Sequence, residues 1–507
     1  MHDSLVDYLR RSVEQRPDAE AVVHRARRVS YRQLWHEVCH LAAFMNARGL
    51  RPGDRVAILL ENSPEYITAY YAALMAGGVA VALNTAAKAR DLANWLTHSG
   101  ASWLIADAQH PEWSEISGAA NLKLSHICVG SAGPMVTNVT GWNDIVGNAA
   151  RPPDTHGAFA QDSAAAIIYT SGTTGRPKGV TLSHRNLVSN VDSILAYLGL
   201  TCEDRCLNVL PFYYSYGASV LHTHLAVGAT LVLEGSMVYV RDVMTRMQTE
   251  RITGFYGVPS TYALILNRTK LSNYNLKSLR YMTQAGGPMA PEHINRLRKE
   301  IPHVRFFVMY GQTEATARLS YLPPEMLEQK LGSAGIPIPN VQLEIRGVLG
   351  NRVPPGTVGE IYAYGPNIMN GYWRDPTATS EVIKGGWLRT GDIAYMDDDG
   401  YIFIQGRESD IIKSGGHRIT PNDIEEAIAE LAGVSEVAVI GVDDEILGQT
   451  IKAIVVPRPG AEVTAMAVKA HCFRRLPAYK IPKFIEFTDT LPRTASGKIK
   501  RFLLASK

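Results

Sequence analysis

In the first part of the chain, the pattern of hydrophobic and polar positions switches between one typical of strands and one typical of helices. Short apolar runs at 55–60, 79–83, 101–107 and 164–168 predict buried strands. Between such runs lie segments of helical character, among them the one that begins at Pro64. Strands that alternate with helices predict an α/β fold with mostly parallel sheets.

Two further segments extend this pattern. Residues 5–49 are expected to form a helical start of the chain. The almost wholly apolar stretch 66–83 could suggest a membrane span, but Asn62-Ser-Pro-Glu is a helix-start signal and Gly77-Gly78 interrupts the stretch. We therefore predict a helix, a turn and a strand there.

The last third of the chain has a different pattern. Alternating runs at 341–345 and 359–364 predict a small antiparallel sheet or barrel. From Pro421 onward the order is helix, strand, strand, helix, strand. A change from strand–helix alternation to this pattern indicates more than one domain.

Length, charge and cysteine content narrow the function classes. A chain of 507 residues is too long for one hydrophobic core. The 51 Lys and Arg exceed the 48 Asp and Glu by only 51 − 48 = 3, too few to indicate a nucleic-acid partner. Five scattered cysteines and the absence of a recognisable signal peptide favour a cytoplasmic location.

The segment Tyr169-Thr-Ser-Gly-Thr-Thr-Gly-Arg-Pro-Lys-Gly179 carries the clearest chemistry. It is expected to lie between the strand 164–168 and a helix that Ser183 caps. Glycines let backbone N–H groups approach an anion, hydroxyls add donors, and Lys178 supplies charge, so the loop suits a polyphosphate. It is not an ordinary P-loop, because Pro177 and Gly179 replace that motif's last Gly and its Ser or Thr.

Two later motifs follow predicted strands. Gln284-Ala-Gly-Gly-Pro-Met289 is a turn of small residues against which a flat base could lie. Val308-Met-Tyr-Gly-Gln-Thr-Glu314 ends a strand rich in Phe and Val. In it Tyr310 offers an aromatic face, and the Glu314 carboxylate could hold magnesium.

Together with Trp387-Leu-Arg-Thr-Gly-Asp392 and Pro492-Arg-Thr-Ala-Ser-Gly-Lys498, these motifs resemble the adenylate-forming enzymes. That superfamily includes acyl- and aryl-CoA synthetases, adenylation domains of nonribosomal peptide synthetases, and beetle luciferases. The resemblance extends from about Leu5 to Arg501. It implies an N-terminal domain, 1–406, of two sheet-based, doubly wound-like subdomains plus a small β-barrel. A hinge at 407–409 and a small mobile α+β C-terminal domain at 410–507 would follow.

The resemblance also implies a role for each matching residue. Lys498, Glu314 and Thr313 would be catalytic, and Glu314 would also bind the metal. ATP and AMP would be bound by Thr170, Ser171, Gly172, Thr173, Thr174, Gly175, Lys178, Gly286, Gly287, Pro288, Tyr310, Gly311, Gln312, Asp392 and Arg407. The acyl pocket would include Tyr213, Tyr214, Tyr216, Gly286 and Gly311. Gly415, Gly416 and Arg418 would meet the pantetheine arm of CoA, and Ser409 would be the hinge pivot.

Departures from the family pattern bear on the substrate. Tyr214 stands where the family has a His, and Ser409 stands where it usually has Asp or Lys. No acid occurs in 210–217, so an α-ammonium group would lack a partner, which argues against amino acids. Gly311 replaces the Trp of acetyl-CoA synthetases and implies an acid larger than acetate. No cation stands out in these stretches, which favours an uncharged aryl or medium-chain acid.

The implied reaction uses ATP, Mg²⁺ and CoA. A carboxylic acid would attack the α-phosphate of ATP, release pyrophosphate and leave an acyl-adenylate, which a thiol then takes up. No motif provides a cysteine for this step, so the thiol would be external. Three alternatives remain open: a ligase that loads a carrier protein, a luciferase-type oxygenase, and a non-catalytic nucleotide-binding module.

Overall fold

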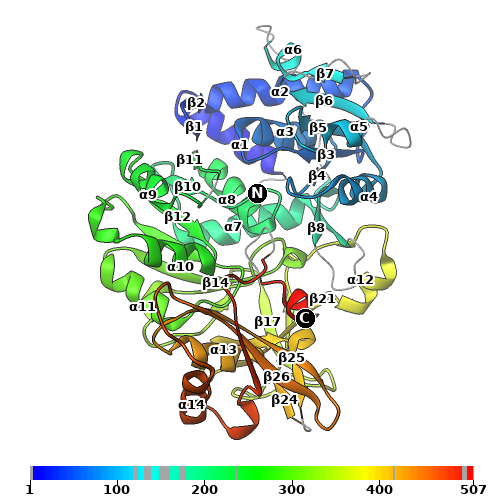
Figure 1. Ribbon diagram of the computed structural model, residues 1–507. Coiled ribbons are helices and arrows are strands. Elements are labelled where there is room, and N and C mark those ends of the chain that lie inside the picture. The colour runs from blue at the N-terminus through cyan, green and yellow to red at the C-terminus, as the bar shows by residue number, and fades with distance from the viewer. Residues whose placement is uncertain are drawn as a thin grey trace.

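The computed structural model describes residues 4–117, 124–130, 139–147, 160–170, 178–235, 237–414, 417–493 and 499–505. The side chains of Ser409, Arg418, Phe502 and Ala505 lie outside this description. Figure 1 shows two large sheet-based regions, with the C-terminal part of the chain packed beneath them.

The first large sheet contains, among the described residues, eight strands in the order β19-β9-β8-β4-β3-β5-β6-β7. Strands β3 to β8 run parallel, β9 pairs antiparallel with β8, and β19 pairs antiparallel with β9. The strands are β3 (Arg55–Leu59), β4 (Val79–Ala82), β5 (Ala101–Asp107), β6 (Ser125–Val129), β7 (Val139–Gly141), β8 (Ala164–Thr170), β9 (Lys178–Ser183) and β19 (Gly371–Tyr372).

The second large sheet has nine strands within the described ranges, in the order β16-β15-β14-β13-β12-β10-β11-β1-β2. Its central six strands are parallel. The strands are β1 (Glu20–His24), β2 (Arg27–Ser30), β10 (Arg205–Asn208), β11 (Thr230–Leu233), β12 (Gly254–Gly257), β13 (Tyr281–Gln284), β14 (Arg305–Tyr310), β15 (Ser320–Leu322) and β16 (Ile336–Pro337).

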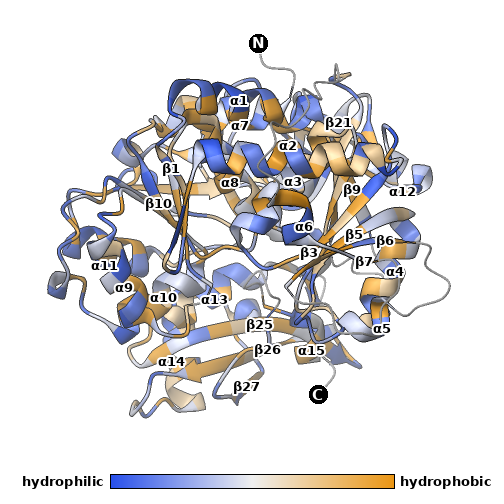
Figure 2. Cartoon of the chain, turned by 90° about the horizontal axis from the view of Figure 1, so that it is seen from above, coloured by the Kyte–Doolittle hydropathy of each residue, from blue (hydrophilic) through white to orange (hydrophobic). Residues whose placement is uncertain are grey.

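One layer of helices lies between the two sheets (Figure 2). Its buried side chains share one core with the inward face of each sheet, for example Val56 of β3 and Val22 of β1. The layer consists of α1 (Leu5–Gln15), α2 (Tyr31–Ala47), α3 (Pro64–Met75), α7 (His184–Leu198) and α8 (Ser215–Val227).

Successive strand residues explain this layering. Val22 faces the shared core, while Val23 faces a second core on the outer side of its sheet. Ala57 of β3 likewise faces a third core. Because neighbouring strand residues point to opposite faces, strands that are apolar throughout need helices on both sides. The outer helices are α9 (Val240–Thr249), α10 (Pro259–Arg268) and α11 (Pro291–Glu300) on one sheet, and α4 (Ala89–Ser99) and α5 (Trp113–Ser117) on the other. Helix α6 (Trp142–Val146) adds Trp142 and Ile145 to the shared core.

A smaller antiparallel sheet follows and forms a half-barrel. Its strands are β17 (Gln342–Arg346), β18 (Gly359–Tyr364), β20 (Ile383–Lys384), β21 (Trp387–Met396) and β22 (Ile402–Arg407). Helix α12 (Pro376–Val382) precedes β20. The prediction of a small antiparallel sheet or barrel is thus confirmed for this region.

The C-terminal part is a separate α+β unit with its own cores on the two faces of one sheet. Helices α13 (Pro421–Ala429) and α14 (Ala465–Arg475) cover one face, and residues near α15 (Arg501–Ala505) cover the other. The strands are β23 (Ile412–Ser414), β24 (His417–Ile419), β25 (Val434–Asp444), β26 (Gly448–Pro457) and β27 (Phe484–Phe487). The predicted order from Pro421 is confirmed, as is the α/β class.

Two local predictions were wrong. The stretch 5–49 is not helical throughout, because β1 and β2 form an antiparallel hairpin in it. The signature segment does not lead directly into a helix, because Lys178–Ser183 is strand β9, which pairs antiparallel with β8. Val180 and Leu182 of β9 are buried in the shared core, and this burial decides the strand. Ser183 does cap the following helix, α7.

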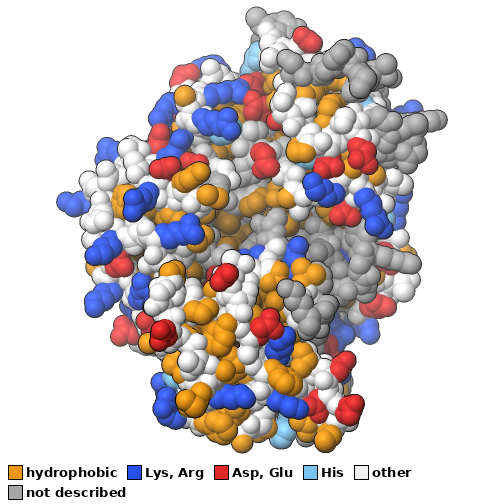
Figure 3. Space-filling view, viewed as in Figure 1, with side chains coloured by type: hydrophobic (Ala, Val, Ile, Leu, Met, Phe, Trp, Pro, Cys, Tyr) orange, Lys and Arg blue, Asp and Glu red, His pale blue; other side chains and the backbone are white. Residues whose placement is uncertain are grey.

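Membrane association and surface charge add little to this picture. In the part of the chain that the structure describes, no helix combines the length and apolar character needed to cross a membrane. The apolar stretch 66–83 is helix α3, a turn and β4, as predicted. Figure 3 shows Lys, Arg, Asp and Glu side chains mixed over one face of the molecule, in line with the small net charge.

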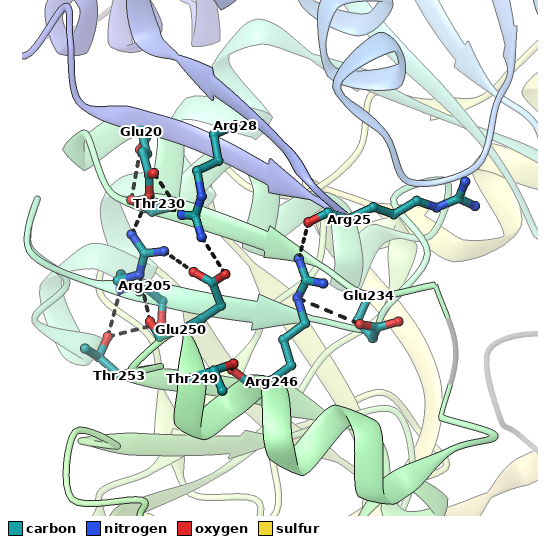
Figure 4. A network of polar contacts seen from close by, with 10 residues as sticks. All are labelled: Glu20, Arg25, Arg28, Arg205, Thr230, Glu234, Arg246, Thr249, Glu250 and Thr253. Carbon is teal, nitrogen blue, oxygen red and sulfur yellow. Dashed lines mark hydrogen bonds and ion pairs between the residues drawn. The ribbon is translucent and has the colours of Figure 1, made fainter.

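A polar network ties the β1–β2 hairpin, at one edge of the second sheet, to the start of β10 and the end of α9 (Figure 4). Arg205 at the start of β10 donates to Glu20 at 2.8 Å and to Glu250 at 2.6 Å. Arg28 of β2 donates to the same two carboxylates, at 2.8 Å each. The side chains of Arg205, Glu20 and Glu250 are partly buried, so their ion pairs are expected to contribute to stability.

Replacing Arg205 is the direct test of this network. We expect Arg205→Met to cost about 1–2 kcal/mol, because two half-buried carboxylates each lose a donor. Thermal unfolding monitored by circular dichroism measures the effect. Arg32→Met is the matched control, since Arg32 pairs with Asp18 in an exposed position and its loss should leave the unfolding midpoint unchanged. Equal midpoints for both variants would contradict the assignment.

Candidate functional site

The carboxyl ends of β13 and β14 place two of the predicted motifs side by side. The two strands are parallel neighbours, with Gln284 opposite Val308. The Gly286-Gly287 turn therefore begins beside Tyr310. Gly286 has a φ of +92°, which a residue with a Cβ adopts only at a cost, so a glycine is required in this turn.

A first polar cluster forms around Asp392 of β21. The Tyr310 hydroxyl donates to Asp392 Oδ2 at 2.6 Å, and Arg407 Nε lies 3.1 Å from Oδ1. Asp392 is only 4 % exposed. Burial and the Asp392 charge raise the pKa of Tyr310, which therefore stays a neutral donor. The Asp392 carboxylate is the main cause that raises the pKa of Arg407.

A second cluster forms around Glu314 of the 3₁₀ turn η2 (Thr313–Ala315). The Tyr372 hydroxyl of β19 donates to Glu314 Oε1 at 3.0 Å, and Lys178 Nζ lies 4.9 Å from the Tyr372 ring centroid. Burial, and then the Glu314 charge, raise the pKa of Tyr372. The Glu314 charge also raises the pKa of Arg407, so the two clusters are neighbours.

The first turn of α8 lies beside this second cluster. The hydroxyl oxygens of Ser215 and Thr313 are 3.2 Å apart. Gln312 Nε2 is buried and has no hydrogen-bond acceptor among the described residues. A buried donor without an acceptor is costly in a closed protein, but a bound ligand oxygen could satisfy it.

The predicted acyl residues form an aromatic group at the same end of α8. The ring centroids of Tyr213 and Tyr214 are 4.7 Å apart, and Tyr213 is buried. The Tyr216 hydroxyl lies 2.8 Å from Thr283 Oγ1 of β13. Their assignment to a substrate pocket stays a prediction.

Gly311 has a packing role that the sequence did not reveal. A Cβ at this position would overlap the carbonyl oxygen of Ala317 and crowd the backbone of Arg318. The glycine is therefore required by the close approach of two backbone segments. Its use as a measure of pocket size remains a prediction.

Several predicted residues fall outside the described part of the chain. These are Ser171, Gly172, Thr173, Thr174, Gly175, Gly415, Gly416 and Lys498, together with the side chains of Ser409 and Arg418. Thr170 ends β8, and Pro288 lies in the turn after β13. The flanks of 494–498 are fixed, because Arg493 bridges Ile499 and Arg501 donates to Glu425 at 2.8 Å.

Three residues of the site were missed from the sequence. Tyr372 lies in none of the motifs named above. Ser215 is a serine at a helix start, and such residues are common. Arg318, four residues beyond Glu314, is a buried cation beside Tyr216, whereas no cation had been expected near these stretches.

Comparison with known proteins decides the family. The AMP-binding enzyme model matches residues 9–373, and the model of the AMP-binding enzyme C-terminal domain matches residues 423–498. The chain belongs to the AMP-binding enzyme family. The resemblance to adenylate-forming enzymes is thereby confirmed.

Individual relatives agree with this membership over nearly the whole chain. A feruloyl-CoA synthase from Amycolatopsis sp is 36% identical over 95% of this chain and 94% of its own length. The structure of an anthranilate CoA ligase with anthranoyl-AMP has a TM-score of 0.91 at 27% identity and covers 99% of this chain and 96% of its own. An o-succinylbenzoate coenzyme A synthetase from Bacillus subtilis, with ATP and magnesium ion, has a TM-score of 0.85 at 30% identity, with 98% of each chain covered.

Asp392 gives the sharpest test of the first cluster. We expect Asp392→Asn to weaken AMP binding by about 10- to 100-fold, because a charged acceptor is lost from a buried position. Titration calorimetry with AMP measures the change. Asp399→Asn, an exposed acid in the turn after the same strand, is the control and should bind AMP like the unmodified protein. Unchanged AMP affinity in Asp392→Asn would remove this cluster from the nucleotide site.

Proposed function

We propose that the protein activates a carboxylic acid larger than acetate, aryl or medium-chain, with ATP and transfers the acyl group to CoA. The observation that carries this proposal is the pair of adjoining clusters around Asp392 and Glu314. They bring together Tyr310, Glu314 and Asp392, the residues to which the family resemblance gives nucleotide and metal roles. The feruloyl, anthranilate and succinylbenzoate ligases among the relatives support an acid with an aromatic ring.

The donor set of the clusters suits ATP. A carboxylate offers about four lone-pair positions, so Asp392 can accept from Tyr310 and Arg407 and still receive the two ribose hydroxyls. Tyr310 and the Gly286–Pro288 turn would hold the adenine. Gln312 Nε2 is a donor that a nucleotide oxygen would satisfy. Thr313, together with Lys178 and the loop before it, would face the phosphates.

Mg²⁺ fits the site as a companion of ATP. Among the described residues, no three His, Cys, Asp or Glu side chains gather into a metal cluster. Mg²⁺ bound through substrate phosphates needs only one or two carboxylates, and Glu314 supplies one. When bound, the ion would screen the negative charge of the phosphates from the attacking carboxylate.

The two half-reactions would use different parts of the C-terminal unit. Lys498 would serve adenylate formation, since a cation there would offset the charge that builds on the α-phosphate. Rotation about Ser409 would then replace it with Gly415, Gly416 and Arg418, which would admit the pantetheine thiol. We further propose that the protein acts in the cytoplasm.

Lys498→Ala tests this division of labour. We expect it to slow acid-dependent pyrophosphate release by at least ~100-fold, and to spare thioester formation from supplied acyl-adenylate. Lys469→Ala, which removes a lysine of α14 in the same C-terminal unit, is the control for both steps. Equal loss of both half-reactions in Lys498→Ala would contradict separate roles.

The identity of the acyl acceptor is tested by offering the unmodified protein either free CoA or a phosphopantetheinyl carrier protein. With ATP, Mg²⁺ and a panel of aryl and fatty acids, we expect a thioester with free CoA, detected by mass spectrometry. Pyrophosphate release without any CoA thioester, but with acylation of a phosphopantetheinyl carrier protein, would replace CoA by a carrier as the acceptor.

A further inference from the structure

Among the described residues, Arg318 is the largest side chain that is fully buried, with 1 % of its surface exposed. Its guanidinium carbon lies 4.7 Å from the Tyr216 ring centroid, and Nη2 donates to Ser219 Oγ at 3.3 Å. Burial raises the pKa of the Tyr197 hydroxyl, and the charge of the neighbouring Arg318 and a hydrogen bond to it oppose this shift. Among the described residues, Nε–H has no acceptor and no carboxylate pairs with the guanidinium.

Such an environment does not balance a buried charge. A guanidinium keeps its proton under all ordinary conditions, so it cannot become neutral on burial. An aromatic face and the hydroxyls of Ser219 and Tyr197 offset part of the lost hydration. A buried cation is normally retained only with an anionic partner, because the desolvation cost is otherwise large. The missing partner is therefore expected to be an anion from outside the described residues.

The position of Arg318 connects it to the reacting end of the site. Its ring partner, Tyr216, lines the predicted acyl pocket and contacts Thr283, three residues before the Gly286 turn. Its hydroxyl partner, Ser219, lies four residues from Ser215, or about 6 Å along α8. Ser215 in turn contacts Thr313.

Accordingly, we propose that Arg318 binds a second carboxylate at the far end of the acid that this site activates. This inference rests on the proposed function and narrows its substrate to a dicarboxylic acid. The planar guanidinium presents paired N–H donors that match a carboxylate. The reacting carboxylate would lie near Thr313, and the second one about one helical turn deeper, beside Ser219 and Tyr216.

The unmodified protein provides the first test. Pyrophosphate release is measured for matched pairs in which a methyl group replaces the second carboxylate. The pairs are terephthalate with 4-methylbenzoate, isophthalate with 3-methylbenzoate, 4-carboxycinnamate with 4-methylcinnamate, and adipate with hexanoate. We expect kcat/KM for the best diacid to exceed that of its monoacid partner by about 100-fold. Equal or reversed preference in every pair would overturn the inference.

Arg318→Met provides the second test, because it removes the charge and keeps an unbranched side chain of related length. We expect it to abolish the preference for the diacid while the matched monoacid is used at least as well as before. Arg298→Met, on the outer helix α11, is the control and should keep the original ratio. Arg318→Lys retains a charge without the planar donors and should restore part of the preference.

The ratio of kcat/KM for the diacid to kcat/KM for its matched monoacid distinguishes substrate binding by Arg318 from a purely structural role. If Arg318 only supports packing, Arg318→Met would lower the activity with both acids equally, and that result would overturn the inference. Should the variant fail to fold, the preference of the unmodified protein still decides. Failure of the proposed function looks different, since no acid of either kind would then release pyrophosphate from ATP.

Discussion

The two large sheets share a single layer of helices, and this shared layer determines where the residues of the site lie. Strands that are apolar throughout must be covered on both faces. Here one layer, including α3, α7 and α8, serves the inner faces of both sheets at once. The hairpin of β8 and β9 in one sheet and the ends of β13 and β14 in the other therefore lie around the same helices. For this reason, residues that are far apart in the sequence lie close together, and the site forms there.

Electrostatics at the meeting point follows from burial. Asp392 and Glu314 are each met by a tyrosine hydroxyl, and burial keeps both tyrosines neutral as donors. Arg407, whose pKa is raised by the Asp392 and Glu314 carboxylates, holds positive charge between the clusters. Such a fixed arrangement suits a reaction between two anions, because carboxylate and phosphate repel until cations and dipoles screen them.

The sequence predicted the elements with strong local signals and missed those that tertiary contacts decide. Runs such as 55–60 and 101–107 are strands because their central residues are apolar, and Ser183 caps α7 through local hydrogen bonds. Strand β9 was missed because its pairing with β8 and the burial of Val180 and Leu182 are tertiary contacts that the sequence does not show. The β1–β2 hairpin was missed within a stretch read as helical. Arg28 of this hairpin donates to Glu250, which follows helix α9 and lies 222 residues away in the sequence.

The sequence motifs were enough to identify the chemistry, but they did not reveal which residues surround each site residue. Tyr310, Glu314 and Asp392 could be named from sequence, because their motifs are specific. Arg318 could not, since its meaning lies in burial and in the lack of a countercharge, and neither is visible in sequence.

The direct test of the account is mass spectrometry of the nucleotide products formed from ATP and an acid with CoA withheld. The account predicts acyl-adenylate and pyrophosphate in equal amounts, with AMP formed only when CoA is added. Formation of ADP and phosphate, with no acyl-adenylate, would contradict it.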